Sequence, residues 1–322
     1  MEVMGMNATR TDRRIGRFNR LVSVAASATA AALLFGATAS PVAATYPGST
    51  NGRIAFGSTV DGNLDIYSVL PNGRAVQRLT DQPGGDICPA YSADGKWIAY
   101  CSGAGGIFEI WTMREDGSAK RQVTSLGRSS TFPDFSPDGS RIVFSSRLAI
   151  AGSPQDVFVV NADGTGLTQL TSDPAEDRWP AWSPDGRTIA FLSSRTGTSQ
   201  VWKMNPDGSD QTQLTFDSVP KDQVPDWSPD GSRIAYVSGT APGGDIWTMS
   251  ADGSSQVAIT NGQPNEYGPA WAPDGTKIAF LNFNERIVYV MNADGTDRYA
   301  VLPGFGVQAV PAWQPRGGDR LP

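Results

Sequence analysis

A phrase made of proline, any residue and an aromatic residue recurs six times and constrains the fold more than any other feature. Successive prolines lie 44, 47, 45, 44 and 42 residues apart, and a repeat of this length is typical of stacked supersecondary units. The six pairs are Pro89 and Tyr91, Pro133 and Phe135, Pro180 and Trp182, Pro225 and Trp227, Pro269 and Trp271, and Pro311 and Trp313. One such unit cannot bury its apolar surface alone, so neighbouring units must pack on each other.

Each unit reads as four short strands. A Ser-Pro-Asp-Gly turn, as at 183–186, follows the aromatic residue, because proline presets the first turn angle and glycine accepts a positive φ. A second strand follows, then a third that carries Ile-Trp or a related pair, as at 201–202. A second glycine turn and a fourth strand, as at 168–171, end the unit. No helical period appears after residue 44, so the pattern predicts an all-β propeller with four-stranded antiparallel blades.

The two ends of the chain complete the count of blades. The unit before Pro89 lacks its first strand, and the C-terminal segment 310–318 supplies a first strand without the other three. The two fragments together make one blade, so the sequence predicts six blades closed by the C-terminal strand. The alternative, a degenerate remnant at the C-terminus, leaves the missing N-terminal strand unexplained. The closing phrase carries Gln-Pro-Arg-Gly, because no second strand follows and the turn is no longer needed.

The unit PAWSPDGRTIAFLSSRTGTSQVWKMNPDGSDQTQLT, residues 180–215, resembles the WD40-like (PD40) repeat of TolB-type β-propellers. The resemblance covers roughly residues 50–317, and we expect no counterpart of the N-terminal α/β domain of TolB proteins. It implies a propeller that binds a protein partner in the cell envelope. The same repeat occurs beside the hydrolase domain of prolyl-oligopeptidase-like peptidases. The G-x-S-x-G serine and the histidine of that domain have no equivalent in this sequence.

Residues 1–44 resemble an export signal, which leaves 45–322 for the propeller. Five arginines precede an uncharged stretch, and cleavage after Ala39 or Ala44 would satisfy the preference for small residues. Either the general secretory route or the twin-arginine route fits, and an uncleaved membrane anchor is the alternative. The sequence therefore predicts an exported protein that is periplasmic, at the cell surface or secreted.

Charge and histidine content narrow the classes of function. Without residues 1–44 the chain keeps 21 basic and 30 acidic groups, a net charge of −9, which gives it no electrostatic reason to bind nucleic acid. Histidine is absent, which removes the commonest general base and metal ligand. We therefore expect a non-catalytic protein, and a monomer.

The two cysteines, Cys88 and Cys101, lie on the two arms of one predicted hairpin. Their similar distances from its turn would let them face each other across paired strands. In an exported protein, an even pair of cysteines favours a disulfide, and two buried thiols are the alternative.

We call the four strands of a unit A to D in chain order. Candidate binding residues lie on the loops that join strands B to C and D to A, because these loops vary whereas the A–B and C–D turns repeat. Three residues before each proline stand Asp86, Ser130, Asp177, Asp222, Glu266 and Gln308. A ring of these acids at the channel mouth could hold Ca²⁺, Mg²⁺ or a cationic group of a partner. Alternatively, each carboxylate accepts backbone N–H groups. We predict no dedicated metal-ligand set.

The D–A loops also carry mixed charge and aromatic side chains, which suit a protein or glycan surface. These residues are Arg128, Arg178, Trp179, Lys221 and Tyr267. Repeated turn aspartates such as Asp138 and Asp185 are expected to be structural. The favoured function is a binding module for an envelope or extracellular protein. The alternative is a propeller that binds glycans, or hydrolyses them with carboxylates alone.

Overall fold

A computed structural model of the chain describes residues 50–147, 153–239, 244–262 and 265–316. All of them belong to the unit Ser40–Pro322, and the predicted export signal lies outside the described residues. Within the described ranges, no helix is long and apolar enough to cross a membrane.

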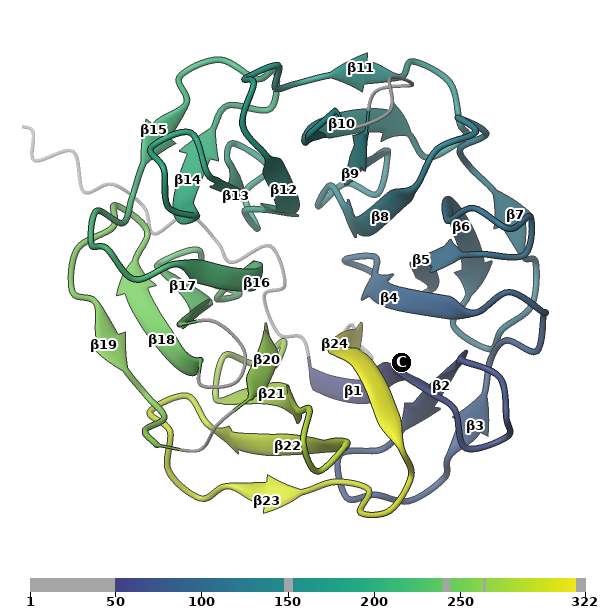
Figure 1. Ribbon diagram of the computed structural model, residues 1–322. Helices are drawn as coiled ribbons and strands as arrows, with labels where there is room; N and C mark the ends of the chain where they lie inside the picture. The colour runs from purple at the N-terminus through teal and green to yellow at the C-terminus, as the bar shows by residue number, and fades with distance from the viewer. Residues whose placement is uncertain (1–49, 148–152, 240–243, 263–264, 317–322) are drawn as a thin grey trace, which may run out of the picture. The chain divides into compact units, whose positions relative to one another are not determined.

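Six four-stranded antiparallel sheets are arranged radially around one axis (Figure 1), which confirms the predicted six-bladed propeller. Blade 1 contains β24 (Val307–Arg316), β1 (Thr50–Ser58), β2 (Asp65–Val69) and β3 (Gln77–Arg78). Blade 2 contains β4 (Asp86–Tyr91), β5 (Trp97–Ser102), β6 (Glu109–Arg114) and β7 (Arg121–Gln122). Blade 3 contains β8 (Ser130–Phe135), β9 (Arg141–Arg147), β10 (Gln155–Asn161) and β11 (Thr168–Gln169). Blade 4 contains β12 (Asp177–Trp182), β13 (Ile189–Ser193), β14 (Gln200–Met204) and β15 (Thr212–Gln213). Blade 5 contains β16 (Lys221–Trp227), β17 (Arg233–Ser238), β18 (Asp245–Ser250) and β19 (Val257–Ala258). Blade 6 contains β20 (Glu266–Trp271), β21 (Lys277–Asn282), β22 (Ile287–Asn292) and β23 (Tyr299–Ala300).

The core lies between neighbouring blades. Every residue of β13 is buried, because its sheet packs against a blade on each face. One apolar cluster joins Val143 and Val159 of blade 3 to Trp182 and Phe191 of blade 4, and similar clusters occupy other junctions. The outermost strands have only two residues each and are largely exposed. A continuous run of apolar residues in the middle strands is therefore the consequence of burial on both faces.

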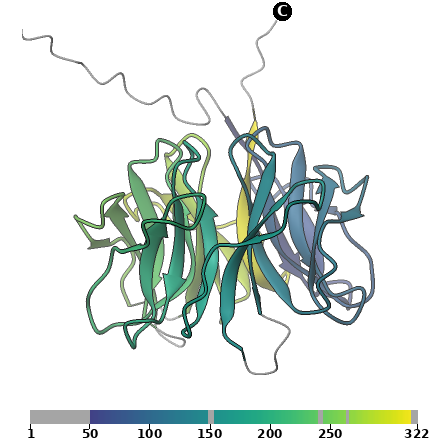
Figure 2. The same ribbon diagram turned by 90° about the horizontal axis from the view of Figure 1, so that it is seen from above.

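The C-terminal strand β24 closes the ring by pairing with β1. Ile54 lies opposite Trp313 and Ala55 opposite Ala312, and the two strands run side by side in Figure 2. The pairing continues to Arg316, so the chain stays extended where the other blades turn. Gln314, at the first position of the altered turn, donates from Nε2 to the Gly95 carbonyl at 3.0 Å and also contacts Glu115 of blade 2. Strand β24 thus pairs with β1 in blade 1 and also forms a hydrogen bond with blade 2.

Each complete blade has an irregular innermost strand. One residue with a positive φ interrupts the ladder there, namely Cys88, Phe132, Trp179, Gln223 or Gly268. The ladder shifts at the same places, as in a β-bulge. The bulge changes the direction of the side chains around it, and the predicted site residues Cys88 and Trp179 lie at this position.

The structure shows Cys88 and Cys101 as two buried free thiols, the alternative to the predicted disulfide. The bulge changes the backbone pairing, so that Cys101 lies opposite Ile87 and Cys88 lies inside the irregularity with a φ of 56°. The two thiols are still in contact, and burial and then a hydrogen bond with Cys88 raise the pKa of the Cys101 thiol. The Cys101 sulfur also accepts the Phe132 N–H of blade 3 at 3.2 Å.

Candidate functional site

The propeller has two chemically different ends. The A–B and C–D turns form the turn end, and the B–C and D–A connections form the loop end. At the turn end, the repeated aspartates bond within their own turns: Asp138 accepts the Ser136 hydroxyl at 2.6 Å and Asp185 accepts the Ser183 hydroxyl at 2.6 Å. This confirms their structural role. All predicted binding residues lie toward the loop end.

The strand register corrects the predicted ring of acids. The first paired residues of the innermost strands are Asp86, Ser130, Asp177, Lys221, Glu266 and Val307. Blade 5 has one residue more between this position and its proline than blade 4 has, so Lys221 takes the ring position and Asp222 the next. Blade 1 is shifted in the same way, and Val307 replaces Gln308. Counting back from the proline could not detect the extra residue.

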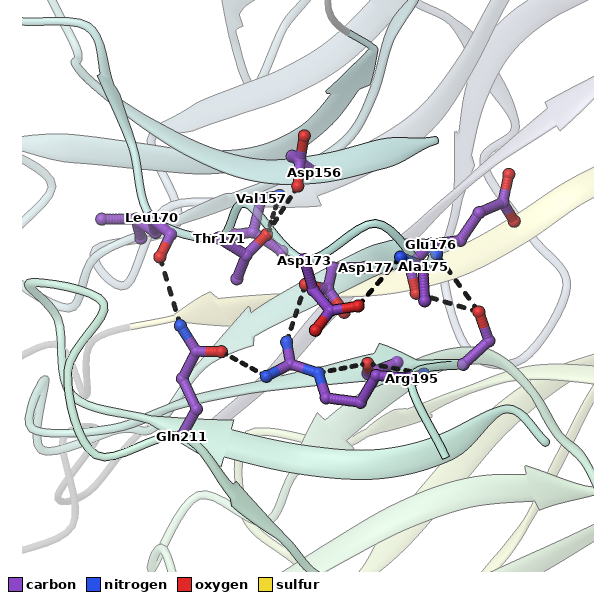
Figure 3. A network of polar contacts seen from close by, with 12 residues as sticks. Asp156, Val157, Leu170, Thr171, Asp173, Ala175, Glu176, Asp177, Arg195 and Gln211 are labelled. Atoms are coloured by element: carbon purple, nitrogen blue, oxygen red, sulfur yellow. Dashed lines mark hydrogen bonds and ion pairs between the residues drawn. The ribbon is translucent and has the colours of Figure 1, made fainter. Parts of the chain in front are cut away.

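The ring residues are also buried rather than presented to a channel mouth. All six have between 0% and 1% of their surface exposed. In blade 4, Arg195 donates from Nη2 to Asp177 at 2.7 Å and from Nη1 to Gln211 at 2.6 Å (Figure 3). In blade 6, Arg298 pairs with Glu266 in the same manner. These two carboxylates are therefore neutralised inside the protein.

The other charged ring positions differ from this pattern. Lys221, whose side chain is fully buried, donates to Asp217 at 2.6 Å, to the Val219 carbonyl at 2.7 Å and to the Ser238 hydroxyl at 3.1 Å. It fixes the D–A loop before blade 5 and is not a surface residue. Burial raises the pKa of Asp86, and hydrogen bonds with Ser102 and Thr80 oppose this shift. No group of three potential metal ligands occurs among the described residues.

The structure does bring other predicted residues together. Arg178, Asp222 and Tyr267 occupy the second position of the innermost strand in three successive blades. The Arg178 guanidinium lies 4.0 Å from the centroid of the Trp179 ring and 3.9 Å from Asp222. Burial, and then the charge of Asp222, raise the pKa of Tyr267.

Two further aromatic residues extend this group. Phe132 contacts Trp179 edge-on with ring centroids 5.5 Å apart, and Phe283 contacts Tyr267 at 5.6 Å. We call Phe132, Arg178, Trp179, Asp222, Tyr267 and Phe283 the mouth cluster. It spans blades 3 to 6 at the loop end, and its members are partly or largely exposed. Such a mixture of half-exposed aromatic rings and paired charges is typical of a recognition surface.

A cavity of about 160 Å³ lies on the axis, lined by the six repeat prolines. Two carboxylates reach it, Asp134 of blade 3 and Asp226 of blade 5. Asp134 accepts the Trp182 backbone N–H at 2.7 Å, and Asp226 accepts the Trp271 N–H at 2.6 Å. Burial raises the pKa of both to about 7, and the charge of Asp134 contributes at Asp226. These groups satisfy strand-edge donors and could also bind a cation or exchange protons.

Known proteins share this architecture and its repeat. The family model described as the TolB beta propeller domain (PD40) matches residues 35–149 and 130–317. The chain belongs to this family. The TolB-type propeller is 45% identical over 56 residues to the Tol-Pal system protein TolB of Desulfosudis oleivorans. That match spans 17% of the chain and only 13% of the relative's length.

Solved structures agree at the level of the fold. TolB from Acinetobacter baumannii superposes with a TM-score of 0.71 at 21% identity, over 84% of this chain and 68% of that one. An oligogalacturonate lyase from Vibrio parahaemolyticus gives a TM-score of 0.56 at 17% identity, over 78% and 74%. At such identities the likeness establishes the propeller and not the activity.

Our sequence reasoning missed Asp134 and Asp226 in this TolB-type propeller. The signal was present, because the residue after the repeat proline is Asp in blades 3 and 5 and Ala at Ala90, Ala181, Ala270 and Ala312. A departure from the repeat marks a position that the common fold does not dictate.

The cavity carboxylates predict an unusual pH dependence of stability. Because their folded pKa of about 7 exceeds the ordinary value of 3.8, the folded state binds more protons than the unfolded state between pH 4 and 7. The free energy of unfolding should therefore fall as pH rises through this window, by on the order of 2 kcal/mol after allowing for cavity solvation. Thermal unfolding at constant ionic strength measures this.

The Asp134→Asn/Asp226→Asn variant should show a flatter profile, since Asn keeps an acceptor for the same N–H groups. Asp138→Asn is the control, because hydrogen bonds from Ser136 and Ser140 lower the pKa of that turn carboxylate and its titration lies below the window. A double variant whose profile runs parallel to that of the wild type would contradict the assignment.

Proposed function

We propose that this TolB-type propeller is an exported, non-catalytic binding module that engages a protein partner of the cell envelope or extracellular space. The observation that carries the proposal is the mouth cluster, in which three non-repeating residues of successive blades meet beside aromatic rings. A rigid scaffold holds them, and variable loops surround them, which is how binding sites are commonly built.

Exposed apolar side chains at the same end support a protein partner. Phe216 is 75% exposed and Val219 44% exposed on the D–A loop before blade 5, and Phe283 is 49% exposed in blade 6. Lys221 fixes the first of these loops from below. Large apolar residues held out on fixed loops lose little conformational freedom on binding, which favours association.

Export is proposed from residues 1–44 and from the relative named as a Tol-Pal system protein. The named relative also favours an envelope partner over a soluble small molecule. Net charge argues for a local and specific contact, because an acidic body gives no general attraction to acidic polymers.

A site-specific photo-crosslinking experiment tests the proposal. A benzophenone amino acid at position 216 or 283, in cells that express the full chain, should give a discrete adduct with one protein. Position 257 is the matched control, because Val257 is 54% exposed on the outer strand β19, away from the loop end. Equal adducts at all three positions, or adducts at 257 alone, would exclude the loop end as the binding surface.

The alternative is a propeller that binds or hydrolyses glycans. Asp177 and Glu266 are buried in ion pairs, and the carboxylates that line the cavity are Asp134 and Asp226. The alternative would replace our proposal if the protein released sugar from a glycan panel and the Asp134→Asn/Asp226→Asn variant lost that turnover.

A further inference from the structure

Arg128, on the D–A loop before blade 3, has no counter-ion among the described residues. Its guanidinium lies 5.4 Å from the centroid of the Phe158 ring, and its Nε is buried without a hydrogen-bond partner. Neither an ion pair nor a side-chain hydrogen bond joins it to the described part of the chain. A guanidinium carries five N–H donors and is always charged, so a half-buried one without partners requires an explanation.

Two other blades show what the common arrangement is. In blade 4 the Arg195 guanidinium lies 4.6 Å from the Trp202 ring and pairs with Asp177 at the ring position. In blade 6 the Arg298 guanidinium lies 4.1 Å from the Tyr289 ring and pairs with Glu266 at the ring position. Each guanidinium thus lies against an aromatic ring of strand C and forms an ion pair with a buried carboxylate of strand A.

Blade 3 has the arginine and the aromatic ring of strand C, but it lacks the carboxylate at the ring position. Its ring position is Ser130, whose hydroxyl donates to Ser146 at 3.2 Å. Glu109, an acid of the preceding blade, accepts the backbone N–H groups of Leu126 and Gly127 at 2.6 and 2.8 Å. Glu109 therefore shapes the loop that carries Arg128 and forms no ion pair with it.

We propose that Arg128 is an anchor for a carboxylate supplied by the protein partner, an aspartate or glutamate side chain or a chain end. The inference rests on the proposed function. A planar guanidinium held against a ring presents parallel N–H groups that match a carboxylate in a bidentate geometry. Arg128 lies on the D–A loop that leads into β8, the strand that carries Phe132 of the mouth cluster, so both lie toward the loop end.

The first test needs no partner and uses acetate as the probe. The Nε–H resonance of Arg128 is followed by ¹⁵N NMR while sodium acetate replaces sodium chloride at constant ionic strength. We expect a saturable shift for Arg128 and none for Arg195, whose carboxylate is already in place. An Arg128 signal that does not respond, or that responds no more than Arg195, overturns the proposal.

Ser130→Asp makes the test sharper, because it supplies the carboxylate that blade 4 has at Asp177. The acetate response should disappear, and the melting temperature should hold or rise as the internal pair forms. Should this buried substitution prevent folding, Arg128→Gln replaces it, with Arg195→Lys as the control that keeps its internal pair. Because Arg128→Gln has no Nε–H at this position, the acetate response is then read at the backbone N–H resonances of residues 127–131. A saturable response of these resonances that persists in Arg128→Gln places the site elsewhere and refutes the proposal.

The second test separates the sources of the carboxylate. An acetylated and amidated tetraglutamate peptide should bind more tightly than tri-galacturonate. Arg128→Gln should weaken the binding of this peptide by at least about tenfold. Tighter binding of tri-galacturonate would overturn the protein source. The proposed function is tested separately by crosslinking at 216 and 283, so an Arg128 that responds to acetate without any crosslinked partner contradicts only that function.

Discussion

Deleting Val310–Pro322 should cost the protein most of its stability and lower its melting temperature by more than about 10 °C. The deletion removes most of the pairing between β24 and β1, and with it Trp313, which is 6% exposed in the core between blades 1 and 6. It also removes Gln314, which holds blade 2. Since large apolar side chains in a core contribute about 3–5 kcal/mol each, the loss approaches the stability of a whole domain. Differential scanning calorimetry and near-ultraviolet circular dichroism measure it.

A matched pair of glycines provides the control within the full chain. Gly95 and Gly139 occupy the same A–B turn in blades 2 and 3, with φ of 68° and 70°. A Cβ at Gly95 would lie 1.9 Å from the Pro315 carbonyl oxygen of the closing strand, whereas a Cβ at Gly139 meets nothing within 4 Å. Gly139→Ala should therefore cost about 1 kcal/mol for its backbone alone, and Gly95→Ala clearly more. Equal costs, together with a deletion variant that melts like the full chain, would refute closure by β24.

Breaking the buried pair of blade 4 should have the second largest effect. Arg195→Gln is expected to destabilise the protein by about 3–5 kcal/mol, because it leaves the fully buried Asp177 carboxylate without its cation. Urea unfolding monitored by tryptophan fluorescence gives the free energy. The double variant Asp177→Asn/Arg195→Gln should recover part of the loss, since no unpaired charge then remains inside.

Glu176→Gln is the control for this prediction. Glu176 also forms an ion pair, with Arg147 at 3.2 Å, but the two side chains are 36% and 46% exposed. Solvent screens such a pair, and its removal should cost less than about 1 kcal/mol. If Arg195→Gln were no more harmful than Glu176→Gln, the interior of this blade junction would have to be far better hydrated than its burial indicates.

The correction at the ring has one physical cause. The sequence repeats so regularly that positions can be counted from the proline, which holds only while every innermost strand has the same length. The longer bulge of blade 5 breaks this regularity, because one extra residue moves every side chain beyond it to the other face of the strand. Asp222 therefore lies one position beyond the ring, at the position that Arg178 and Tyr267 occupy in the neighbouring blades.

The sequence by itself determined the number of blades, the four strands of each and the closure by the C-terminus, because turn chemistry and alternation act over a few residues. It also marked Arg178, Trp179, Asp222 and Tyr267 as candidate binding residues, although it could not show that they lie close together. Only the tertiary structure decided which charges are paired, because pairing depends on how the connections of a blade bring their side chains to its innermost strand. Asp177 and Glu266 form ion pairs with arginines, and Lys221 is buried. Arg128 has no carboxylate partner among the residues that the structure describes.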